Sequence, residues 1–193
     1  MADERWLIPA FSFVAFQLFG ATLERFEVAP RNLSAPERRT RWSNIFMSLV
    51  HSCLSSAGCA ACLWFDPRLL ADISEGHTAL TARVVAFSWG YFVHDLVHTL
   101  LNRRLAAAWD ILLHHVIVVC CFGVAVLHRR YLNFACASLI CEFSSVLLHA
   151  RQLRNMTQPS PRALLVANAV VYVVARLLTL AYMTLWLRRN RLL

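Results

Sequence analysis

Apolar residues in this chain are grouped into six long stretches, which short polar segments separate. The stretches run over residues 6–23, 43–65, 79–101, 109–127, 131–149 and 164–187. Each of them approaches or exceeds the roughly 17 to 25 residues that an α-helix needs to cross a bilayer. The segments between them are rich in Arg, Pro, Asn or Asp. The pattern therefore predicts an all-α membrane protein, a polytopic bundle of about six transmembrane helices.

Composition supports a membrane location. Of the 193 residues, 59% are hydrophobic and only 16% are charged. Soluble domains carry about 25% charged residues. The first apolar stretch is preceded by Asp3 and Glu4 and is longer than the apolar region of a signal peptide, so we expect a retained helix.

The net charge of +8 comes entirely from arginine, because the chain contains no lysine. Nucleic-acid-binding proteins gather basic residues into a patch or stripe, whereas these arginines lie mainly between the apolar stretches. We therefore expect membrane lipids as partners and no nucleic acid. Ten arginines in segments 24–42, 102–108 and 150–163, against seven in the opposite segments, predict that the first set is cytoplasmic. The plasma membrane and the endoplasmic reticulum both stay open as locations, and no oligomeric state is indicated.

Seven cysteines all fall inside apolar stretches. Cys59 and Cys62 form a CxxC motif, but no second pair follows at zinc-site spacing, and a thioredoxin-like strand–helix context is absent. We therefore interpret these thiols as small packing groups and predict no metal site.

Ionisable residues inside the apolar stretches are unusually numerous. A charge at the centre of a bilayer costs about 2.5–3.5 kcal/mol on insertion scales, so each such residue requires a partner, a cavity or a function. The set comprises His51, His94, Asp95, His98, Asp110, His114, His115, Glu142, His149 and Arg176.

Helical spacing relates several of these residues to one another. His94 and His98 are four residues apart and share a helix face, and Asp95 is close enough in sequence to bond the His98 imidazole. One helical turn separates Asp110 from His114 in the same way. A carboxylate-oriented imidazole in a dry site has the features of a general base or a nucleophile.

Some of these residues have structural interpretations that compete with a functional one. His51 and His149 are typical of packing or interfacial groups. Asp110 lies near a helix start, where a carboxylate stabilises the helix dipole. Glu142 and Arg176 are both mid-span, and the sequence favours equally a structural ion pair and a polar substrate pocket.

Four motifs follow one another in a fixed order: RWSNIFMSLVHS, SWGYFVHDLVHTL, AWDILLHHVIV and LICEFSSVLL. Together they resemble the TLC-domain family, which includes the ceramide synthases and the translocating-chain-associated membrane proteins. The resemblance is nearest to the small TLC-domain-containing proteins associated with membrane lipid composition and fluidity, and it covers about residues 40–187. A His-Asp pair followed some twenty residues later by two histidines is its most specific feature.

The resemblance implies a helical bundle around a polar cavity that holds lipid. By position, His114 and His115 match the paired histidines of the family, and His94 and Asp95 match the preceding polar pair, so these four are the candidate catalytic residues. One of the paired histidines would accept an acyl group or take a proton from the acceptor. The candidate substrate-binding residues are His51, His98, Asp110, Glu142 and Arg176.

The resemblance also divides the chain into an N-terminal transmembrane helix with a basic loop, residues 1–39, and a TLC domain, residues 40–193. Chains of this family usually carry a further C-terminal helix, so we expect that a last helix is lacking here. The segment TLLNRRLAAAW between the two histidine-bearing stretches is shorter than its counterpart in ceramide synthases.

The sequence is compatible with three functions. The resemblance favours a membrane protein that regulates phospholipid acyl composition and fluidity, with or without intrinsic catalysis. The first alternative is an acyltransferase of ceramide-synthase type, with acyl-CoA as co-substrate and no bound cofactor. The second is a membrane oxidase with a histidine-ligated metal or haem, although one HxxxH and one HH supply fewer imidazoles than such enzymes use.

Overall fold

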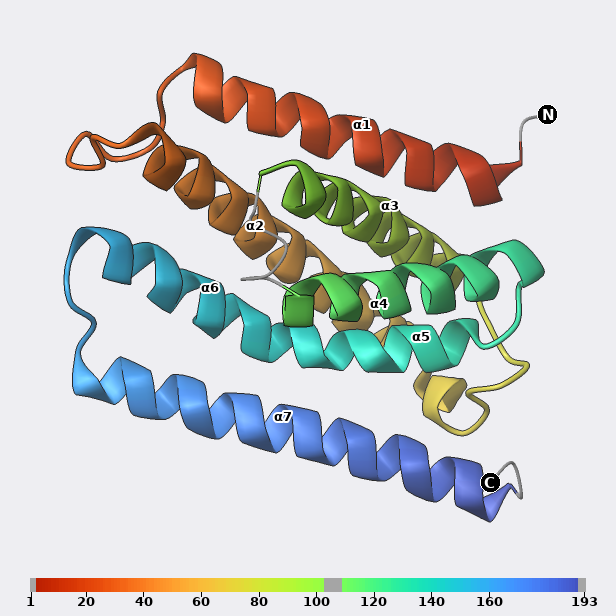
Figure 1. Cartoon of the computed structure of the whole chain (residues 1–193). Helices are drawn as coiled ribbons and strands as arrows, with labels where there is room; N and C mark the ends of the chain where they lie inside the picture. The colour runs from red at the N-terminus through yellow and green to blue at the C-terminus, as the bar shows by residue number, and fades with distance from the viewer. Residues whose placement is uncertain (1–2, 103–108, 191–193) are drawn as a thin grey trace.

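The computed structural model describes residues 3–102 and 109–190, and within these ranges the chain is built from helices without strands (Figure 1). Five spans are single helices: α1 (Glu4–Arg25), α2 (Pro36–Phe65), α3 (Ala79–Asn102), α4 (Trp109–His128) and α7 (Arg162–Arg189). The remaining span, which is the fifth along the chain, consists of α5 (Leu132–Ser138), the 3-10 turn η3 (Leu139–Cys141) and α6 (Glu142–Thr157). A short 3-10 helix, η1 (Pro67–Leu70), follows α2.

The six predicted spans are confirmed, because six helices are long and apolar enough to cross a membrane. Two boundaries differ from the prediction. Helix α2 begins at Pro36, seven residues before the apolar stretch, because proline at the first helical position pre-sets the helical backbone. The fifth span along the chain, Leu132–Thr157, continues eight residues beyond the apolar stretch and is interrupted by η3, directly before Glu142.

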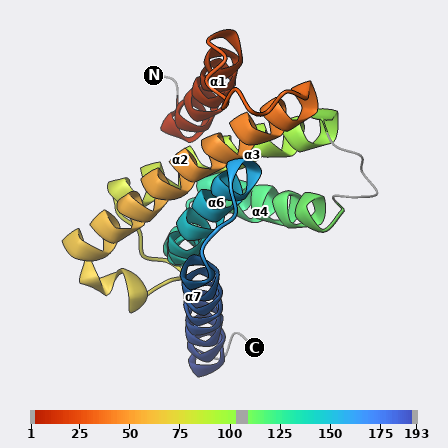
Figure 2. The ribbon, with the colours of Figure 1, turned by 90° about the vertical axis from the view of Figure 1, so that its left-hand side faces the viewer.

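The helices pack in a layered arrangement with α1 and α7 on opposite outer sides (Figure 2). Helix α1 packs on α3, α2 packs on α3 and α6, α4 packs on α3, and α7 packs on α6 and η3. The contact between α1 and α3 is close because Gly90 has no side chain: a Cβ there would meet the Pro9 carbonyl oxygen at 2.2 Å. Ser12 also donates a hydrogen bond of 2.7 Å to the Phe87 carbonyl across this contact.

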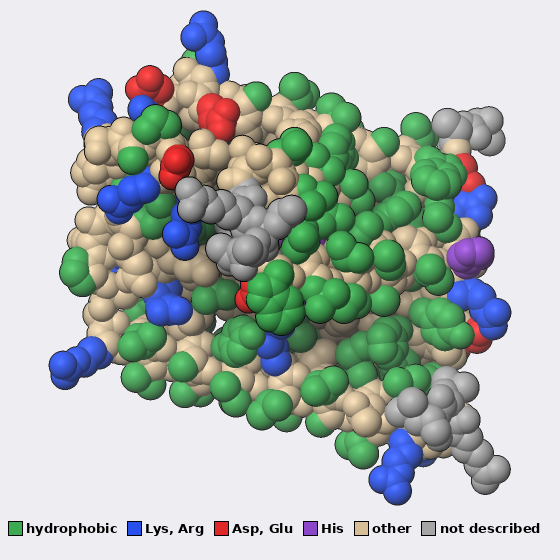
Figure 3. All heavy atoms as spheres, in the orientation of Figure 1, with side chains coloured by type: hydrophobic (Ala, Val, Ile, Leu, Met, Phe, Trp, Pro, Cys, Tyr) green, Lys and Arg blue, Asp and Glu red, His purple; other side chains and the backbone are tan. Residues whose placement is uncertain are grey.

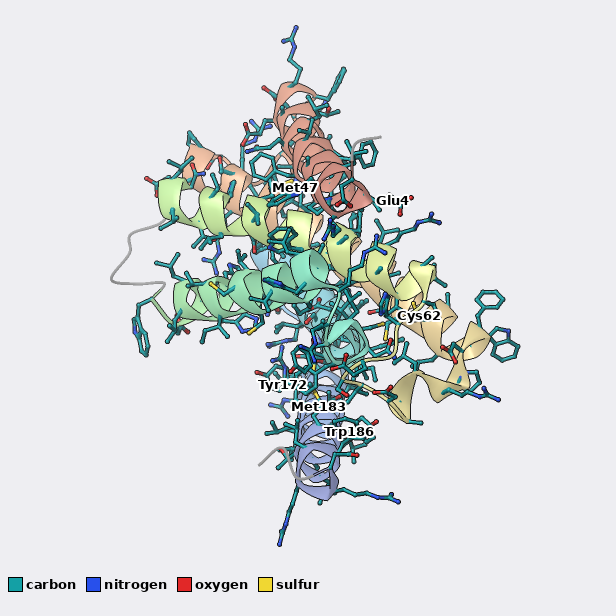
Figure 4. All side chains as sticks on the ribbon, turned by 90° about the vertical axis from the view of Figure 1, so that its right-hand side faces the viewer. Glu4, Met47, Cys62, Tyr172, Met183 and Trp186 are labelled. Atoms are coloured by element: carbon teal, nitrogen blue, oxygen red, sulfur yellow. The ribbon has the colours of Figure 1, made fainter. Side chains whose placement is uncertain are left out.

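The buried core lies between α1, α2 and α3 on one side and α4 and α5 on the other. Phe16 of α1 packs edge-on against Tyr91 of α3, with ring centroids 4.7 Å apart. Met47 of α2 is buried beside them, as Figure 4 shows on the side of α2 that faces α1. These contacts leave the opposite faces of α2 and α3, with α4, α6 and α7, to form the site described below.

The two ends of the bundle carry the charged residues, and a hydrophobic belt lies between them (Figure 3). Helix α1 ends and α2 begins at the same end of the bundle as the junction between α6 and α7, so segments 26–35 and 158–161 lie at that end (Figure 1). Arg103 and Arg104 belong to residues outside the described ranges, as does the tail from 191 onward. The grouping of the described loops agrees with the predicted topology, and which end is cytoplasmic stays a prediction.

Candidate functional site

A cavity of about 460 Å³ lies inside the bundle, and five of the six spans contribute to its wall. Most of the residues that line it have polar or charged side chains, although it lies within segments that are long and apolar enough to span a membrane. In Figure 3 the surface is hollowed between α4 and α7, and a basic side chain lies within the hydrophobic face there. Ionisable residues inside a membrane span need a partner, a cavity or a function, and this cavity provides a polar environment for them.

Helical periodicity explains why these polar residues converge. Side chains three or four positions apart share a helix face, and each helix contributes such a set. The sets are Arg41, Asn44, Ser48, His51 and Ser52 on α2; Tyr91, Asp95 and Thr99 on α3; Asp110, His114 and His115 on α4; Glu142, Ser145, His149 and Gln152 on α6; and Tyr172 and Arg176 on α7.

The centre of the site is a carboxylate–imidazole pair between α3 and α4. Asp95 Oδ2 lies 3.3 Å from His115 Nε2, and both residues are buried. The other carboxylate oxygen, Oδ1, accepts a hydrogen bond of 3.2 Å from the Asn44 side-chain amide of α2. Asp95 thus joins three helices, and its negative charge favours the His115 tautomer that carries a proton on Nε2.

His114 has a different environment from its neighbour. It lines the cavity and is exposed, whereas His115 is 8% exposed, and their ring centroids are 5.7 Å apart. Asp110 lies in the first turn of α4 and also lines the cavity. The expected hydrogen bond between Asp110 and His114 is not formed among the described residues.

Glu142 and Arg176 both line the cavity, but they do not form the ion pair that the sequence left as one alternative. Glu142 Oε2 accepts a hydrogen bond of 2.6 Å from Ser52 Oγ of α2. The Arg176 guanidinium lies over the Tyr172 ring, 4.5 Å from its centroid. The ion pairs among the described residues include no contact between Glu142 and Arg176. This geometry matches the polar-pocket alternative.

His94 and His98 lie on another face of α3. They are absent from the cavity wall that the structure describes, while the adjacent residues Asp95 and Thr99 belong to it. His94 is 1% exposed and packs against Phe13 and Phe16 of α1. The structure therefore separates these two histidines from the other seven predicted site residues, which it brings together. Their roles stay predictions that rest on the resemblance.

His51 combines the packing and functional interpretations. Its ring stacks on Tyr91 at 3.8 Å between centroids, and it also lines the cavity. His149, which the sequence favoured as a packing group, lines the cavity as well and lies 3.3 Å from Gln152 Oε1.

Sequence reasoning missed the neutral polar members of the wall. Asn44, Ser52 and Tyr172 each contact an ionisable residue of the site. Their signal was their spacing, because Asn44, Ser48 and Ser52 recur every four residues on the face that carries His51. Pairing Asp95 with His98 by sequence distance also overlooked His115, which comes from a different helix.

The cysteines lie mostly away from this site. Cys59, Cys62 and Cys136 are buried, and Cys59 Sγ lies 3.4 Å from the Cys136 carbonyl oxygen, as expected for packing thiols. Cys53, Cys120 and Cys121 are instead exposed. Among residues 3–102 and 109–190, no three His, Cys, Asp or Glu side chains are grouped so as to hold a metal ion.

Comparison with known proteins identifies the family of the chain. A model of the TLC domain matches residues 41–192, a range that includes every residue of the cavity wall. The chain belongs to the TLC-domain family. With six candidate spans, it is an integral multi-pass membrane protein.

Similar members of the TLC-domain family carry names that give the domain and no activity. The chain is 38% identical to TLC domain-containing protein 2 of Mus musculus over 98% of its own length and 61% of that protein. It is 37% identical to TLC domain-containing protein 2 of Danio rerio, over 78% of the chain and 63% of the relative. It is 33% identical to TLC domain-containing protein 1 of Gallus gallus, over 93% of the chain and 75% of the relative. The chain thus spans less than two thirds of the first two relatives. No solved structure matches it.

Proposed function

We propose that this protein binds membrane lipids in its polar cavity and thereby regulates the acyl composition of phospholipids and the fluidity of the membrane. The observation that carries the proposal is the cavity itself, about 460 Å³ of space bordered mainly by residues with polar or charged side chains, inside a bundle whose visible surface is largely apolar in Figure 3. A polar cavity at this depth accommodates the headgroup of a lipid whose acyl chains stay in the hydrocarbon. The family resemblance supports the same class of ligand.

The chemistry available in the cavity is acid–base chemistry at an oriented imidazole. With its Nε2 proton directed at Asp95, the His115 ring carries its basic lone pair on Nδ1. Asp95 also stabilises the imidazolium that forms when His115 takes a proton. His114, exposed on the cavity wall, is the better placed of the two histidines to contact a ligand.

Lipidomics of cells that lack the natural protein tests this proposal. We expect removal to change the acyl chains of phospholipids and the wild-type chain to restore them. His115→Ala should fail to restore them, because the pair with Asp95 is lost. His128→Ala is the matched control, since His128 is exposed at the end of the same helix and lies outside the cavity wall. Unchanged acyl chains after removal of the protein would contradict the proposal.

A second candidate is an acyltransferase that uses acyl-CoA. It is favoured by the shape of the site, because the cavity wall extends from His115 to Arg41, in the first turns of α2 at an arginine-rich end. An acyl group would pass from the CoA sulfur to an acceptor amine or hydroxyl, and the proton that the acceptor loses would reach the thiolate through the imidazole. Purified protein with labelled acyl-CoA tests this reaction. Intact transfer in both His114→Ala and His115→Ala would exclude the imidazole mechanism.

A further inference from the structure

Arg176 is a cation in the middle of α7 that forms no direct ion pair among the described residues. It is the fifteenth residue of a helix that begins at Arg162, so it lies about 21 Å along the helix axis at 1.5 Å per residue. Within the described residues, no carboxylate lies within ion-pair distance of its guanidinium, and its buried Nε has no hydrogen-bond partner. A charge at this depth is unfavourable unless an anion or a polar cavity compensates it.

The central carboxylates of the cavity make their direct contacts with other groups, and Glu142 attracts the Arg176 guanidinium only through space. Glu142 accepts a hydrogen bond from Ser52, and Asp95 is held between His115 and Asn44. Asp110, in the first turn of α4, also lines the cavity, but it forms no ion pair with Arg176 among the described residues. Tyr172 supports the guanidinium from one side through its ring, which fixes the orientation of the cation without neutralising it. The cavity therefore holds a positioned cation that a ligand anion can pair with.

The rest of the wall suits a ligand with several oxygen atoms. Gln152 and His114 line the same cavity as Arg176 and carry N–H groups that can donate to a ligand, whereas the hydroxyl protons of Ser48 and Ser52 are already donated to the Asn44 carbonyl and to Glu142. A fatty-acid carboxylate would need one cation and few further hydrogen bonds. The phosphate of a phospholipid headgroup accepts hydrogen bonds at several oxygens, and arginine binds phosphate through two parallel N–H groups.

The arrangement of α4 and α7 leaves a path from the bilayer to this cation. Helix α7 packs on α6 and η3, and α4 packs on α3 and α5, so the two helices diverge on either side of α6 (Figure 2). Both nevertheless line the cavity, which makes the space between them part of it. Val173 and Leu177, the residues that follow Tyr172 and Arg176, are 50% and 59% exposed and supply an apolar surface for acyl chains.

We infer that Arg176, supported by Tyr172, binds the phosphate of a phospholipid headgroup that enters from the bilayer between α4 and α7. This inference rests on the proposed lipid-binding function and adds to it the class of ligand, the residue that recognises it and the direction of entry. The phosphate site is distinct from the His115–Asp95 pair, so binding and any acid–base step are separable by mutation.

Binding measurements on the full purified chain in detergent test the inference, with lysophosphatidic acid as the phosphate probe. Monoacylglycerol, oleate and inorganic phosphate serve as the comparison ligands. We expect R176Q to weaken binding of lysophosphatidic acid at least about tenfold, because the charge-assisted contact is lost. R188Q is the matched control, since Arg188 is exposed at the end of the same helix. The R188Q variant should bind lysophosphatidic acid with the affinity of the wild type.

The comparison ligands separate the possible sources of the anion. Weak binding of monoacylglycerol, oleate and inorganic phosphate supports a lipid phosphate. Oleate that binds as tightly as lysophosphatidic acid, or inorganic phosphate that binds as tightly without a lipid, overturns the assignment. Equal affinity of monoacylglycerol and lysophosphatidic acid overturns the phosphate site while leaving the lipid cavity intact. Absence of binding by every lipid overturns the proposed function as well.

A second variant covers the case in which R176Q does not fold, as judged by size-exclusion chromatography and the melting temperature. R176K keeps the charge but loses the planar group that lies over Tyr172. We expect R176K to bind lysophosphatidic acid more weakly than the wild type does. It should still bind this lipid more tightly than the wild type binds monoacylglycerol. Wild-type affinity in a folded R176Q, or monoacylglycerol-like affinity in R188Q, contradicts the inference.

Discussion

Helices α1 and α7 are the two outermost spans of the bundle, and they cover it in different ways. Helix α1 lies directly on α3, where Gly90 permits close approach to Pro9 and Ser12 bonds the Phe87 carbonyl. Helix α7 is attached near its C-terminal end, where Tyr182 and Trp186 donate hydrogen bonds to the Leu70 and Ala71 carbonyls. Its middle borders the cavity.

The difference shows how two apolar spans come to serve different purposes. Small residues on α1 and α3 remove space between helices, so that interface is a closed structural contact. Tyr172 and Arg176 on α7 instead keep a polar surface facing α2, α4 and α6. Ionisable residues on α3 follow the same division: His94 faces α1, and the neighbouring Asp95 faces the cavity.

The largest expected effect is on folding, at the α1–α3 contact. In Gly90→Ala the new Cβ would meet the backbone of Pro9, which cannot move without displacing α1, so we expect a loss of about 1–3 kcal/mol or more in the free energy of unfolding. The melting temperature in detergent measures it. Gly20→Ala is the control, because its Cβ meets the flexible end of Met47 at 3.1 Å and should cost less. Equal melting temperatures for the two variants would show that the α1–α3 contact is not close.

The next effect concerns function on the two faces of α3. Asp95→Asn removes the charge that orients His115, so we expect loss of the effect on phospholipid acyl chains, or about a 100-fold lower rate if the protein transfers acyl groups. His94→Phe keeps a ring packed against Phe13 and Phe16 and should retain function. Lipidomics of complemented cells distinguishes the two variants. A folded His94→Phe protein without function would place His94 in the machinery, as the family resemblance implies.

A smaller effect is expected at the attachment of α7. Tyr182→Phe and Trp186→Phe each remove one hydrogen bond to the turn around η1, at a cost of about 1 kcal/mol. Each should lower the melting temperature by a few degrees without changing the structure of α1. Val174→Ala is the control on the exposed side of α7, where we expect little change. A larger loss in Val174→Ala than in Trp186→Phe would show that α7 is held mainly by its exposed face.

The smallest effect is a pH dependence in the loop outside the membrane. Hydrogen bonds from the backbone N–H of Glu75, and then from Ser74, hold the pKa of Asp72 below its ordinary value. The contribution to stability is therefore present above the unfolded-state pKa of about 3.9 and is lost as the pH falls through the lower folded-state pKa. We expect Asp72→Asn to melt slightly below the wild type at pH 6, with the difference disappearing under acidic conditions. A difference that grows with acidity would contradict this assignment.

Much of the fold could be predicted from the sequence, because the length of an apolar stretch is set by the thickness of the bilayer. All six spans are found where the apolar stretches predicted them. The interruption at η3 was not predicted, because Leu139–Cys141 is as apolar as the helices around it. Its consequence is local: it places Glu142 at the first position of α6, facing Ser52.

The site could be predicted only in part, because sequence spacing relates residues within one helix and says little about rotation between helices. The cost of burying ionisable groups identified Asp95, His115, Glu142 and Arg176. The rotation of α3 and α4 relative to each other decides which carboxylate contacts which imidazole. In the structure this rotation places Asp95 against His115. Neutral residues such as Asn44 are not unusual inside an apolar stretch, so the sequence did not single them out. Their place in the site follows only from the packing of the helices.

The central claim is that a lipid headgroup occupies the space between α4 and α7 at mid-membrane depth. Photo-crosslinking of the purified chain in bilayers, with a phospholipid that carries a diazirine in its headgroup, tests this claim most directly. We predict adducts, mapped by mass spectrometry, on Glu142 or Tyr172 in the cavity wall and none in the middle of α1. Adducts confined to the ends of the helices, where headgroups of bulk lipid lie, would contradict the account.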